Sequence, residues 1–339
     1  MKNLIPNSIK KTRRSLKQER YSLKPGLYFI NYPYACRIRG KVPKNLKNDF
    51  KKNLLHINSI GKFKKVASNL AFGFVWRKKS ENQSKENFSF LYRSGRGHIK
   101  LFDVERDLIL IDYKDPELAS VINKFSLKNR YLPLNEIRYE GGSLIEEKYI
   151  AGEPLSNLSL QKKKSFYEKI LRKFNEKHET PKRSTYWRQK DLEKLFQSDT
   201  LSNFIKTIKH DMIIRKEKIL RLLVDSPVEL THGDLNFKNT IYKDGKFYVI
   251  DLEHVNYRPF FYDLIYLPFN DLFTSEGSEP AINDLRHLFD GSLLKVLSKK
   301  NNYLDVTIKD FVLAFLLIKA KEGFYYKYSD QEKLLNYFF

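Results

Sequence analysis

The pattern of apolar and polar positions changes along the chain, from strand-like runs in the first half to helical spacing in the second. Runs of β-branched and aromatic residues bounded by turn signals predict strands at residues 88–93, 98–103, 107–115, 132–142 and 143–150. A helix is expected at about residues 116–129, between the third and fourth of these strands. Further on, Phe166, Ile170, Leu171 and Phe174 recur at helical spacing and predict one buried face. Helices are also expected near residues 201–212, 282–297, 307–321 and 330–339.

A β-hairpin is predicted late in the chain. Residues 240–243 and 246–250 are β-branched and aromatic runs that flank Asp244-Gly245. Asp-Gly favours a type I′ turn, because both of its central residues adopt positive φ. This register places Lys243 opposite Lys246 and, counting outward, Asn239 opposite Ile250.

Three oxygen-bearing side chains surround this hairpin at spacings that phosphoryl transfer can use. Asn239 lies five residues after Asp234, and Asp251 lies immediately after the second strand. Phosphoryl transfer needs a carboxylate near the acceptor hydroxyl and hard oxygen ligands for Mg²⁺ at the nucleotide phosphates. Strict strand alternation would put Asn239 and Asp251 on opposite faces, so a shared metal site requires the ladder to end at this point.

The segment HGDLNFKN, followed by IDLE, resembles the catalytic signature of the aminoglycoside phosphotransferase and choline kinase-like superfamily. The motif is met at His232, Gly233, Asp234, Asn239, Asp251 and Glu253. The resemblance implies that Asp234 is the catalytic base and that Asn239 and Asp251 bind metal. Glu253 is either a further metal ligand or a solvated side chain. His232 is expected to position the loop, and the resemblance implies that Asp263 braces it through backbone hydrogen bonds.

The resemblance also implies an α+β fold: a two-lobed protein-kinase-like fold with an antiparallel-sheet N-lobe and a mainly helical C-lobe. We expect a basic N-terminal extension, partly strand, at residues 1–85, an N-lobe at 86–150 and a C-lobe at 151–339. The C-lobe would carry the catalytic loop at 231–239 and the metal-binding segment at 250–253. The implied cofactors are ATP and Mg²⁺.

Nucleotide contacts are expected from the N-lobe. Gly95 and Gly97 form a turn that could admit phosphates to the backbone, although a plain hairpin turn fits the sequence equally well. In the resembled fold a basic residue on the third strand contacts the phosphates and pairs with a Glu on the next helix. Lys114 is the first candidate for this residue and Lys100 the second, with Glu117 as the acid partner. The resemblance further implies that backbone groups between Glu147 and Tyr149 hold the adenine.

The formal charge of +23 is concentrated at the N-terminal end. Residues 1–80 contain 21 Lys and Arg against Glu19 and Asp49, which gives +19. Such asymmetry indicates a polyanionic partner, either nucleic acid, an acidic polysaccharide or an anionic membrane surface, although a solvated basic arm is the alternative.

Targeting signals are not evident. Cys36 is the single cysteine, so no internal disulfide forms, which fits a reducing compartment. The start of the chain lacks the apolar stretch of a secretory signal, and the longest apolar run, at residues 311–318, is too short to cross a membrane. The expected location is the cytoplasm, with peripheral membrane contact as a further hypothesis.

These features predict an ATP-dependent phosphotransferase that acts on a hydroxyl group of a small molecule or sugar. Residues 281–339 carry 9 Lys and Arg against 7 Asp and Glu, too little acid to favour a polycationic acceptor. By analogy with lipopolysaccharide-core sugar kinases, we hypothesise a sugar of a cell-surface glycoconjugate as the acceptor. A choline- or aminoglycoside-type kinase is the alternative enzyme. A catalytically silent module that binds nucleic acid or membrane through residues 1–80 is the alternative of a different class.

Overall fold

Two compact units make up the chain. The computed structural model describes residues 26–31, 34–37, 74–78, 90–94, 96–103, 106–176, 213–274, 293, 296–297 and 305–322. Contacts group residues 1–126 and 135–153 into the first unit, and residues 127–134 and 154–339 into the second. Apart from residues 127–134, the division falls after residue 153, close to the predicted lobe boundary at residue 150.

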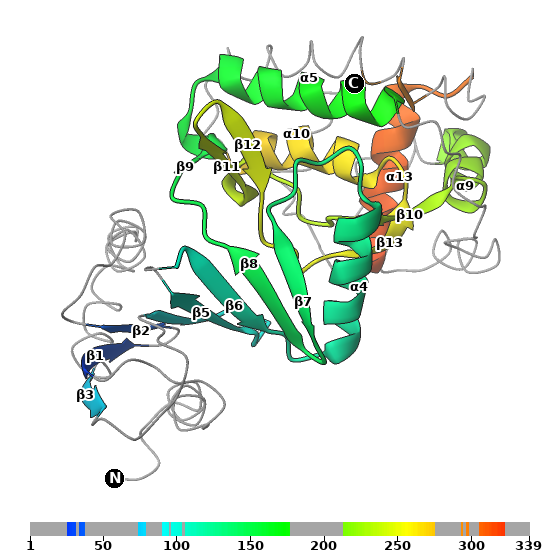
Figure 1. Ribbon diagram of the computed structural model, residues 1–339. Helices are drawn as coiled ribbons and strands as arrows, with labels where there is room; N and C mark the ends of the chain where they lie inside the picture. Colours follow the sequence, from blue (N-terminus) through cyan, green and yellow to red (C-terminus); the bar gives the residue numbers. More distant parts are fainter. Residues whose placement is uncertain are drawn as a thin grey trace, which may run out of the picture. The chain divides into compact units, whose positions relative to one another are not determined.

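An antiparallel sheet dominates the described part of the first unit (Figure 1). Its strand order is β3-β1-β2-β4-β5-β6-β8-β7. The strands are β1 (Gly26–Asn31), β2 (Tyr34–Arg37), β3 (Phe74–Lys78), β4 (Phe90–Arg93), β5 (Ile99–Asp103), β6 (Leu108–Asp112), β7 (Ile137–Gly141) and β8 (Leu144–Lys148). β2 pairs with β4, so strands from the predicted N-terminal extension continue the sheet of the predicted N-lobe.

Helix α4 (Pro116–Lys128) follows β6, as the sequence predicts. Proline at the first position has a φ that suits a helix start, and the Asp115 carboxylate accepts a hydrogen bond from the Glu117 N–H at 2.9 Å. Ala119, Ile122 and Phe125 are buried at three-residue intervals. Their spacing gives α4 a single apolar face.

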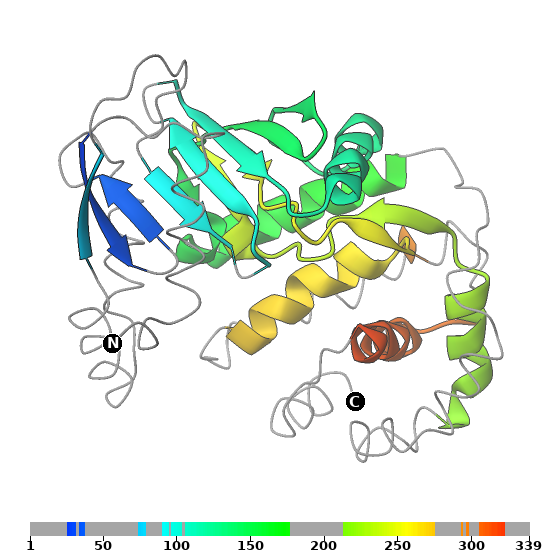
Figure 2. The same cartoon turned by 90° about the horizontal axis from the view of Figure 1, so that it is seen from below.

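The long helices described in the second unit are α5 (Leu160–Glu176), α9 (Lys216–Val224), α10 (Tyr262–Thr274) and α13 (Ile308–Lys321). Figures 1 and 2 show α10 and α13 as neighbours. The predicted buried face of α5 is confirmed, since Phe166, Ile170, Leu171 and Phe174 are at most 3 % exposed. A capping box between Thr307 and Asp310 begins α13 close to the predicted start. The helices predicted at 201–212 and 330–339, and most of that at 282–297, lie outside the described residues.

The strands of the second unit frame residues 232–255, named the catalytic segment after the roles predicted for Asp234 and Asp251. β10 (Val228–Thr231) precedes it and pairs with β13 (Asn256–Pro259), which follows it. Between them lie the short helix η2 (Phe237–Asn239) and the hairpin of β11 (Thr240–Lys243) and β12 (Lys246–Val249). β9 (Glu153–Pro154) and the short helix η1 (Leu155–Asn157) lead into α5, and β9 adds to the edge of β11.

These elements confirm the predicted α+β, two-lobed protein-kinase-like fold class, with an antiparallel sheet in one unit and mainly helices in the other. None of the helices described is both long and apolar enough to span a membrane.

Candidate active site

The hairpin predicted from Asp244-Gly245 forms with the predicted register. Lys243 pairs with Lys246, and the last ladder pair is Thr240 with Val249. Asp244 has φ 49° and Gly245 has φ 77°, the two positive values of a type I′ turn. Phe247 packs against Phe166 of α5 with ring centroids 5.1 Å apart, so α5 supports the outer face of the hairpin (Figure 1).

The open end of the hairpin brings Asn239 and the Asp251 segment together. The Ile250 N–H donates to the Asn239 carbonyl at 3.0 Å, one step beyond the last ladder pair. Asn239 ends η2 rather than continuing β11, and Asp251 leaves the strand with a φ of 67°. The ladder thus ends where a shared metal site requires it to end, and the alternation of faces no longer separates the two side chains.

Asp263 holds the backbone of the catalytic loop. It lies in the first turn of α10 with no exposed surface. Its carboxylate accepts hydrogen bonds from the N–H groups of His232, at 2.6 Å, and Gly233, at 2.9 Å. The Tyr131 hydroxyl donates to the same carboxylate at 3.2 Å, and burial, followed by the negative charge of Asp263, raises the pKa of Tyr131, which keeps this donor protonated.

His232 links the catalytic loop to the end of the hairpin. The ring is fully buried. Its Nε2 lies 3.0 Å from the Ile250 carbonyl, and its Nδ1 accepts the Asp234 N–H at 3.3 Å. This arrangement requires the proton on Nε2. His232 therefore connects the residue before Asp251 to the backbone of Asp234 and does not face solvent as a proton carrier would.

Asn236 shapes the turn between Asp234 and Asn239. Its side-chain oxygen accepts the N–H groups of Lys238, at 2.9 Å, and Asn239, at 3.0 Å, and so caps η2. Its side-chain nitrogen donates to the Asp234 carbonyl at 3.0 Å. Asn236, which is not one of the motif residues, thus holds the backbone between Asp234 and Asn239 in its turn.

The Asp234 carboxylate is engaged on both oxygens. Asn239 Nδ2 donates to Asp234 Oδ2 at 2.9 Å and also to the Asp234 carbonyl at 2.9 Å. The Tyr266 hydroxyl donates to Asp234 Oδ1 at 2.5 Å. Because the Asn239 nitrogen faces Asp234, the Asn239 amide oxygen points to the other side and suits a hard cation.

The three residues with predicted chemistry differ from their neighbours in exposure. Asp234, Asn239 and Asp251 are half-buried, whereas Leu235 and Leu252 are buried. Glu253 is only 6 % exposed, which excludes the alternative of a solvated side chain. No group of three or more His, Cys, Asp or Glu in the described part of the chain could hold a metal by itself. This donor set fits Mg²⁺, which commonly binds one or two carboxylates and completes its shell with phosphate oxygens and water.

A buried charged cluster behind the loop was missed at the level of sequence. Arg258 of β13 pairs with Glu322 at 2.5 Å and donates to the His254 carbonyl at 3.0 Å. Burial by itself lowers the pKa of Arg258, but Tyr262 and the Glu322 carboxylate raise it above its ordinary value. Lys319, which is 3 % exposed, donates to the Tyr262 hydroxyl at 3.2 Å. The sequence signal for this cluster was a largely apolar α13 with two basic residues, Lys319 and Lys321, in its last turn.

Gly233 is required by this packing. Its φ is +80°, and a Cβ at this position would overlap the His254 carbonyl and the Arg258 guanidinium. Gly245 has a similar φ of +77° but no atom within 4 Å of the place that a Cβ would take. A side chain at Gly245 would therefore meet only the strain of positive φ, whereas one at Gly233 would meet this strain and a steric overlap.

We expect Gly233→Ala to destabilise the protein far more than Gly245→Ala. Positive φ alone costs about 1–2 kcal/mol for alanine, and the matched control Gly245→Ala should lose only this amount. Gly233→Ala should lose about 2–3 kcal/mol more, because backbone around Asp234 must move to relieve the overlap. Thermal and urea unfolding of both variants measure the difference. Equal losses would show that the loop accommodates a side chain at position 233.

The two candidate phosphate-binding lysines of the first unit differ in position and in exposure. Lys100 lies within β5 and is half-buried, whereas Lys114 lies beyond the end of β6 and is exposed. The Lys114 N–H donates to Nδ1 of the buried His98 at 3.0 Å. Glu117 is exposed, and across residues 106–176 no ion pair joins it to Lys114. The choice between Lys100 and Lys114 stays a prediction.

The glycine turn is a closed hairpin loop between β4 and β5. The Ser94 N–H donates to the His98 carbonyl at 3.0 Å, and the Gly97 N–H donates to the Ser94 carbonyl at 2.9 Å. Gly97 has a φ of 91°. This geometry matches the plain hairpin alternative, and the Gly97 N–H already has a partner. Gly95 lies outside the described residues.

The segment predicted to hold adenine has most of its N–H groups occupied. The Tyr149 N–H donates to the Asp107 carbonyl at 2.6 Å, and the Lys148 N–H donates to the Glu136 carbonyl at 3.1 Å. Glu147 lies in β8, which pairs with strands on both sides, and its side chain accepts from Asn135 at 3.3 Å. An adenine contact by Tyr149 would therefore have to use its carbonyl.

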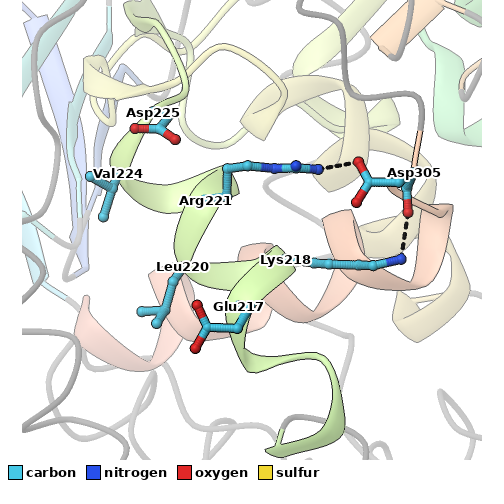
Figure 3. Close-up of a pocket in the computed structure, with 7 residues that line it drawn as sticks. All are labelled: Glu217, Lys218, Leu220, Arg221, Val224, Asp225 and Asp305. Atoms are coloured by element: carbon cyan, nitrogen blue, oxygen red, sulfur yellow. Dashed lines mark hydrogen bonds and ion pairs between the residues drawn. The ribbon is translucent and has the colours of Figure 1, made fainter.

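A hollow of about 460 Å³ lies along α9, apart from the residues described above (Figure 3). Lys218 and Arg221 extend from α9 to Asp305, and the Lys218 ammonium donates to the Asp305 carbonyl at 2.5 Å. The hydrogen bond from Arg221 lowers the pKa of Asp305. The lining residues are Glu217, Lys218, Leu220, Arg221, Val224, Asp225 and Asp305. None of them belongs to the catalytic segment, so this hollow is not the candidate active site.

The catalytic segment lies within a match to a known family. Residues 148–294 match the model of the phosphotransferase enzyme family. This match confirms the predicted resemblance and, with it, the predicted enzyme class, a phosphotransferase. No curated protein sequence matches the chain.

Three small-molecule kinases are among the solved structures that match the chain. The amicoumacin kinase hAmiN, in complex with AMP-PNP, Ca²⁺ and its ligand, is 13 % identical over 87 % of this chain and 91 % of its own, with a TM-score of 0.35. A choline/ethanolamine kinase family protein from Mesorhizobium loti is 15 % identical over 68 % of this chain and 87 % of its own, with a TM-score of 0.37. A glucosamine kinase is 12 % identical over 64 % and 68 % of the two chains, with a TM-score of 0.40. Likenesses of this extent say nothing about the acceptor.

Proposed function

We propose that this protein transfers the γ-phosphoryl group of ATP to a hydroxyl group of a small molecule, with Asp234 as the catalytic base and Mg²⁺ as the metal. The observation that carries the proposal is the geometry of the β11–β12 hairpin. Its open end joins Asn239 to Ile250 by a backbone hydrogen bond and turns the chain at Asp251. Asp234 is tied to the same Asn239 through its carboxylate.

The proposed roles follow from chemistry and hydrogen bonding. The Asp234 carboxylate would orient the acceptor hydroxyl and accept its proton. The Asn239 amide oxygen and the Asp251 carboxylate would bind Mg²⁺, which neutralises phosphate charge when it is bound. Glu253 is a further candidate ligand from its position in the motif. His232 and Asp263 would keep the loop in this conformation through the contacts described above.

Candidate nucleotide contacts in the first unit remain those of the sequence: Lys100 or Lys114 for phosphate, with Glu117 as acid partner, Gly95 and Gly97 for backbone approach, and Glu147 to Tyr149 for adenine. The lysine choice is open to a direct comparison. Lys100→Met and Lys114→Met each remove one ammonium group, at two different positions. The variant that loses ATP affinity therefore identifies the phosphate-binding residue.

For the acceptor we propose a neutral or anionic sugar, such as one of a glycoconjugate made at a membrane surface. The supporting observations are the near-neutral charge of residues 281–339 and the +19 of residues 1–80, which suits an anionic surface. A screen with labelled ATP tests the proposal with neutral sugars, phosphorylated sugars, choline, ethanolamine and aminoglycosides as acceptors. Phosphorylation of an amine-bearing acceptor alone would overturn the sugar proposal and leave the enzyme class intact.

Binding measurements on the same protein distinguish a catalytically silent module from an enzyme. A protein that binds no nucleotide, yet binds polyanions with steep salt dependence, would contradict the enzymatic proposal. An enzyme should keep Mg²⁺-dependent ATP consumption in the full chain whether or not a polyanion is present.

We expect loss of the Asp251 carboxylate to weaken Mg²⁺-dependent ATP binding more than loss of the Asp234 carboxylate. Because Asp251 has a φ of 67°, Asp251→Asn is the suitable variant, since asparagine tolerates this conformation better than alanine. Calorimetric titration of ATP with and without Mg²⁺ compares Asp251→Asn with Asp234→Asn. Each charge-assisted ligand contact contributes about 1.5–3 kcal/mol, so the affinity should fall by about tenfold or more in Asp251→Asn. Equal losses in both variants would contradict the assigned roles.

A further inference from the structure

Tyr266 is held against the catalytic carboxylate from a different element. It lies in the second turn of α10, is 9 % exposed, and donates its hydroxyl to Asp234 Oδ1 at 2.5 Å. Asn239 holds the other oxygen, Oδ2, at 2.9 Å. The carboxylate is thus fixed by one donor on each oxygen, which prevents its rotation about the Cβ–Cγ bond.

The Tyr266 ring is itself fixed by packing. It stacks on Tyr262, one turn earlier in α10, with centroids 5.9 Å apart and planes 7° apart. Phe315 of α13 contacts the ring with a centroid separation of 6.0 Å. A ring packed from two helices has one accessible orientation, so the hydroxyl direction is set before any substrate binds.

A buried cation lies over this ring. Lys319 Nζ is 4.7 Å from the Tyr266 centroid, in the last turn of α13. Its ammonium group is in turn oriented by the Tyr262 hydroxyl at 3.2 Å and by Glu322 at 4.0 Å. A cation over an aromatic face withdraws electron density from the ring and makes the phenol a stronger hydrogen-bond donor. Short distances are typical of hydrogen bonds from a hydroxyl to a carboxylate.

We propose that Tyr266 is the positioning residue of the catalytic base, an inference that rests on the proposed function. Its hydroxyl fixes Asp234 Oδ1 so that the remaining lone pair of this oxygen faces the acceptor hydroxyl. An ionised carboxylate has about four acceptor positions, so the bonds from Tyr266 and Asn239 leave room for the acceptor. Lys319 strengthens the Tyr266 donor through its position over the ring.

A structural role and a positioning role predict different kinetics for Tyr266→Phe. A tyrosine that only satisfies its buried hydroxyl would change stability and leave turnover of the folded enzyme unaltered. A tyrosine that orients the base should change kcat and leave the KM for ATP unaltered, because the phenylalanine ring keeps the packing and the base does not hold the nucleotide.

The test measures Mg²⁺-dependent ATP hydrolysis, in which water takes the place of the acceptor. We expect kcat of Tyr266→Phe to fall by about tenfold to hundredfold, the cost of a misplaced reacting group, with KM for ATP unchanged. Tyr167→Phe is the matched control, because the Tyr167 hydroxyl is also buried and donates to α10, at the Leu264 carbonyl, 3.2 Å away. An unchanged kcat in Tyr266→Phe, or an equal fall in Tyr167→Phe, would overturn the proposal.

A spectroscopic measurement tests the contact independently of turnover. A short hydroxyl-to-carboxylate hydrogen bond should give a proton resonance well downfield of the amide region. This resonance should be present in the wild type and in Tyr167→Phe, and absent in Tyr266→Phe and Asp234→Asn. If the downfield spectrum of Tyr266→Phe equals that of the wild type, the bond does not exist in solution and the inference fails. A wild type that shows the resonance but consumes no ATP would instead refute the proposed function.

Discussion

Asp234→Asn is expected to slow phosphoryl transfer by orders of magnitude while the protein stays folded and binds ATP. The variant keeps the size of the side chain, and its amide oxygen can still accept the Tyr266 hydroxyl in a weaker, neutral hydrogen bond that lacks the far-downfield resonance. It loses the negative charge that orients the acceptor hydroxyl and takes its proton. General base catalysis contributes about 10²–10⁴-fold, and kcat should fall by this factor. Labelled-ATP turnover with the acceptor found by screening measures the loss, and calorimetry measures ATP affinity.

Asp244→Asn is the matched control for this substitution. Asp244 is exposed in the hairpin turn and has a φ of 49°, which asparagine adopts as readily as aspartate. The same chemical change ten residues away should therefore leave turnover, affinity and stability unaltered. Residual turnover in Asp234→Asn equal to that of Asp244→Asn would refute the assignment of Asp234 as the base.

Asp263→Ala is expected to cause the largest loss of stability among single substitutions near the site. Its carboxylate has no exposed surface and accepts from His232, Gly233 and Tyr131. Alanine leaves these three donors buried without their acceptor. Removal of one partner from a buried charged network costs about 3–5 kcal/mol, which thermal or denaturant unfolding detects readily. The fraction that remains folded should also turn over slowly, because the loop that carries Asp234 loses its anchor.

Asp310→Ala is the control that separates the loss of stability from the loss of turnover. Asp310 is also an unexposed aspartate in the first turn of a helix, where it accepts the Thr307 N–H at 2.8 Å and pairs with Arg215 at 2.9 Å. It should lose stability for comparable reasons yet keep kcat per folded molecule. A normal kcat in folded Asp263→Ala would show that the loop holds its conformation without this anchor.

Local sequence signals predicted the hairpin and several helices correctly. The turn of β11 and β12 follows from two residues that accept positive φ, and its register follows by counting from the turn. Helix α5 follows from the apolar spacing of Phe166, Ile170, Leu171 and Phe174. Such features depend on neighbours along the chain, so no knowledge of the fold was needed.

The pairing of β10 with β13 was not predicted, although it frames the whole catalytic segment. Thr231 meets Asn256 across that pair, with the loop, η2 and the hairpin between them in the sequence. Four-residue strands of mixed polarity have a weak local signal, and only the packing of distant elements selects the pair. The occupied N–H groups in the segment predicted to hold adenine also depend on tertiary pairing, since β8 has a partner strand on each side.

The sequence by itself predicted the chemistry, from an aspartate, an asparagine and a second aspartate at fixed spacing around an Asp-Gly turn. The tertiary structure decided how these groups are held. Tyr131 reaches Asp263 from 132 residues away, and Tyr266 reaches Asp234 from 32 residues away. The positions of these three residues can be read from the sequence because one short hairpin connects them. The supporting hydrogen bonds depend on how α10 and α13 pack behind the loop, which no local pattern specifies.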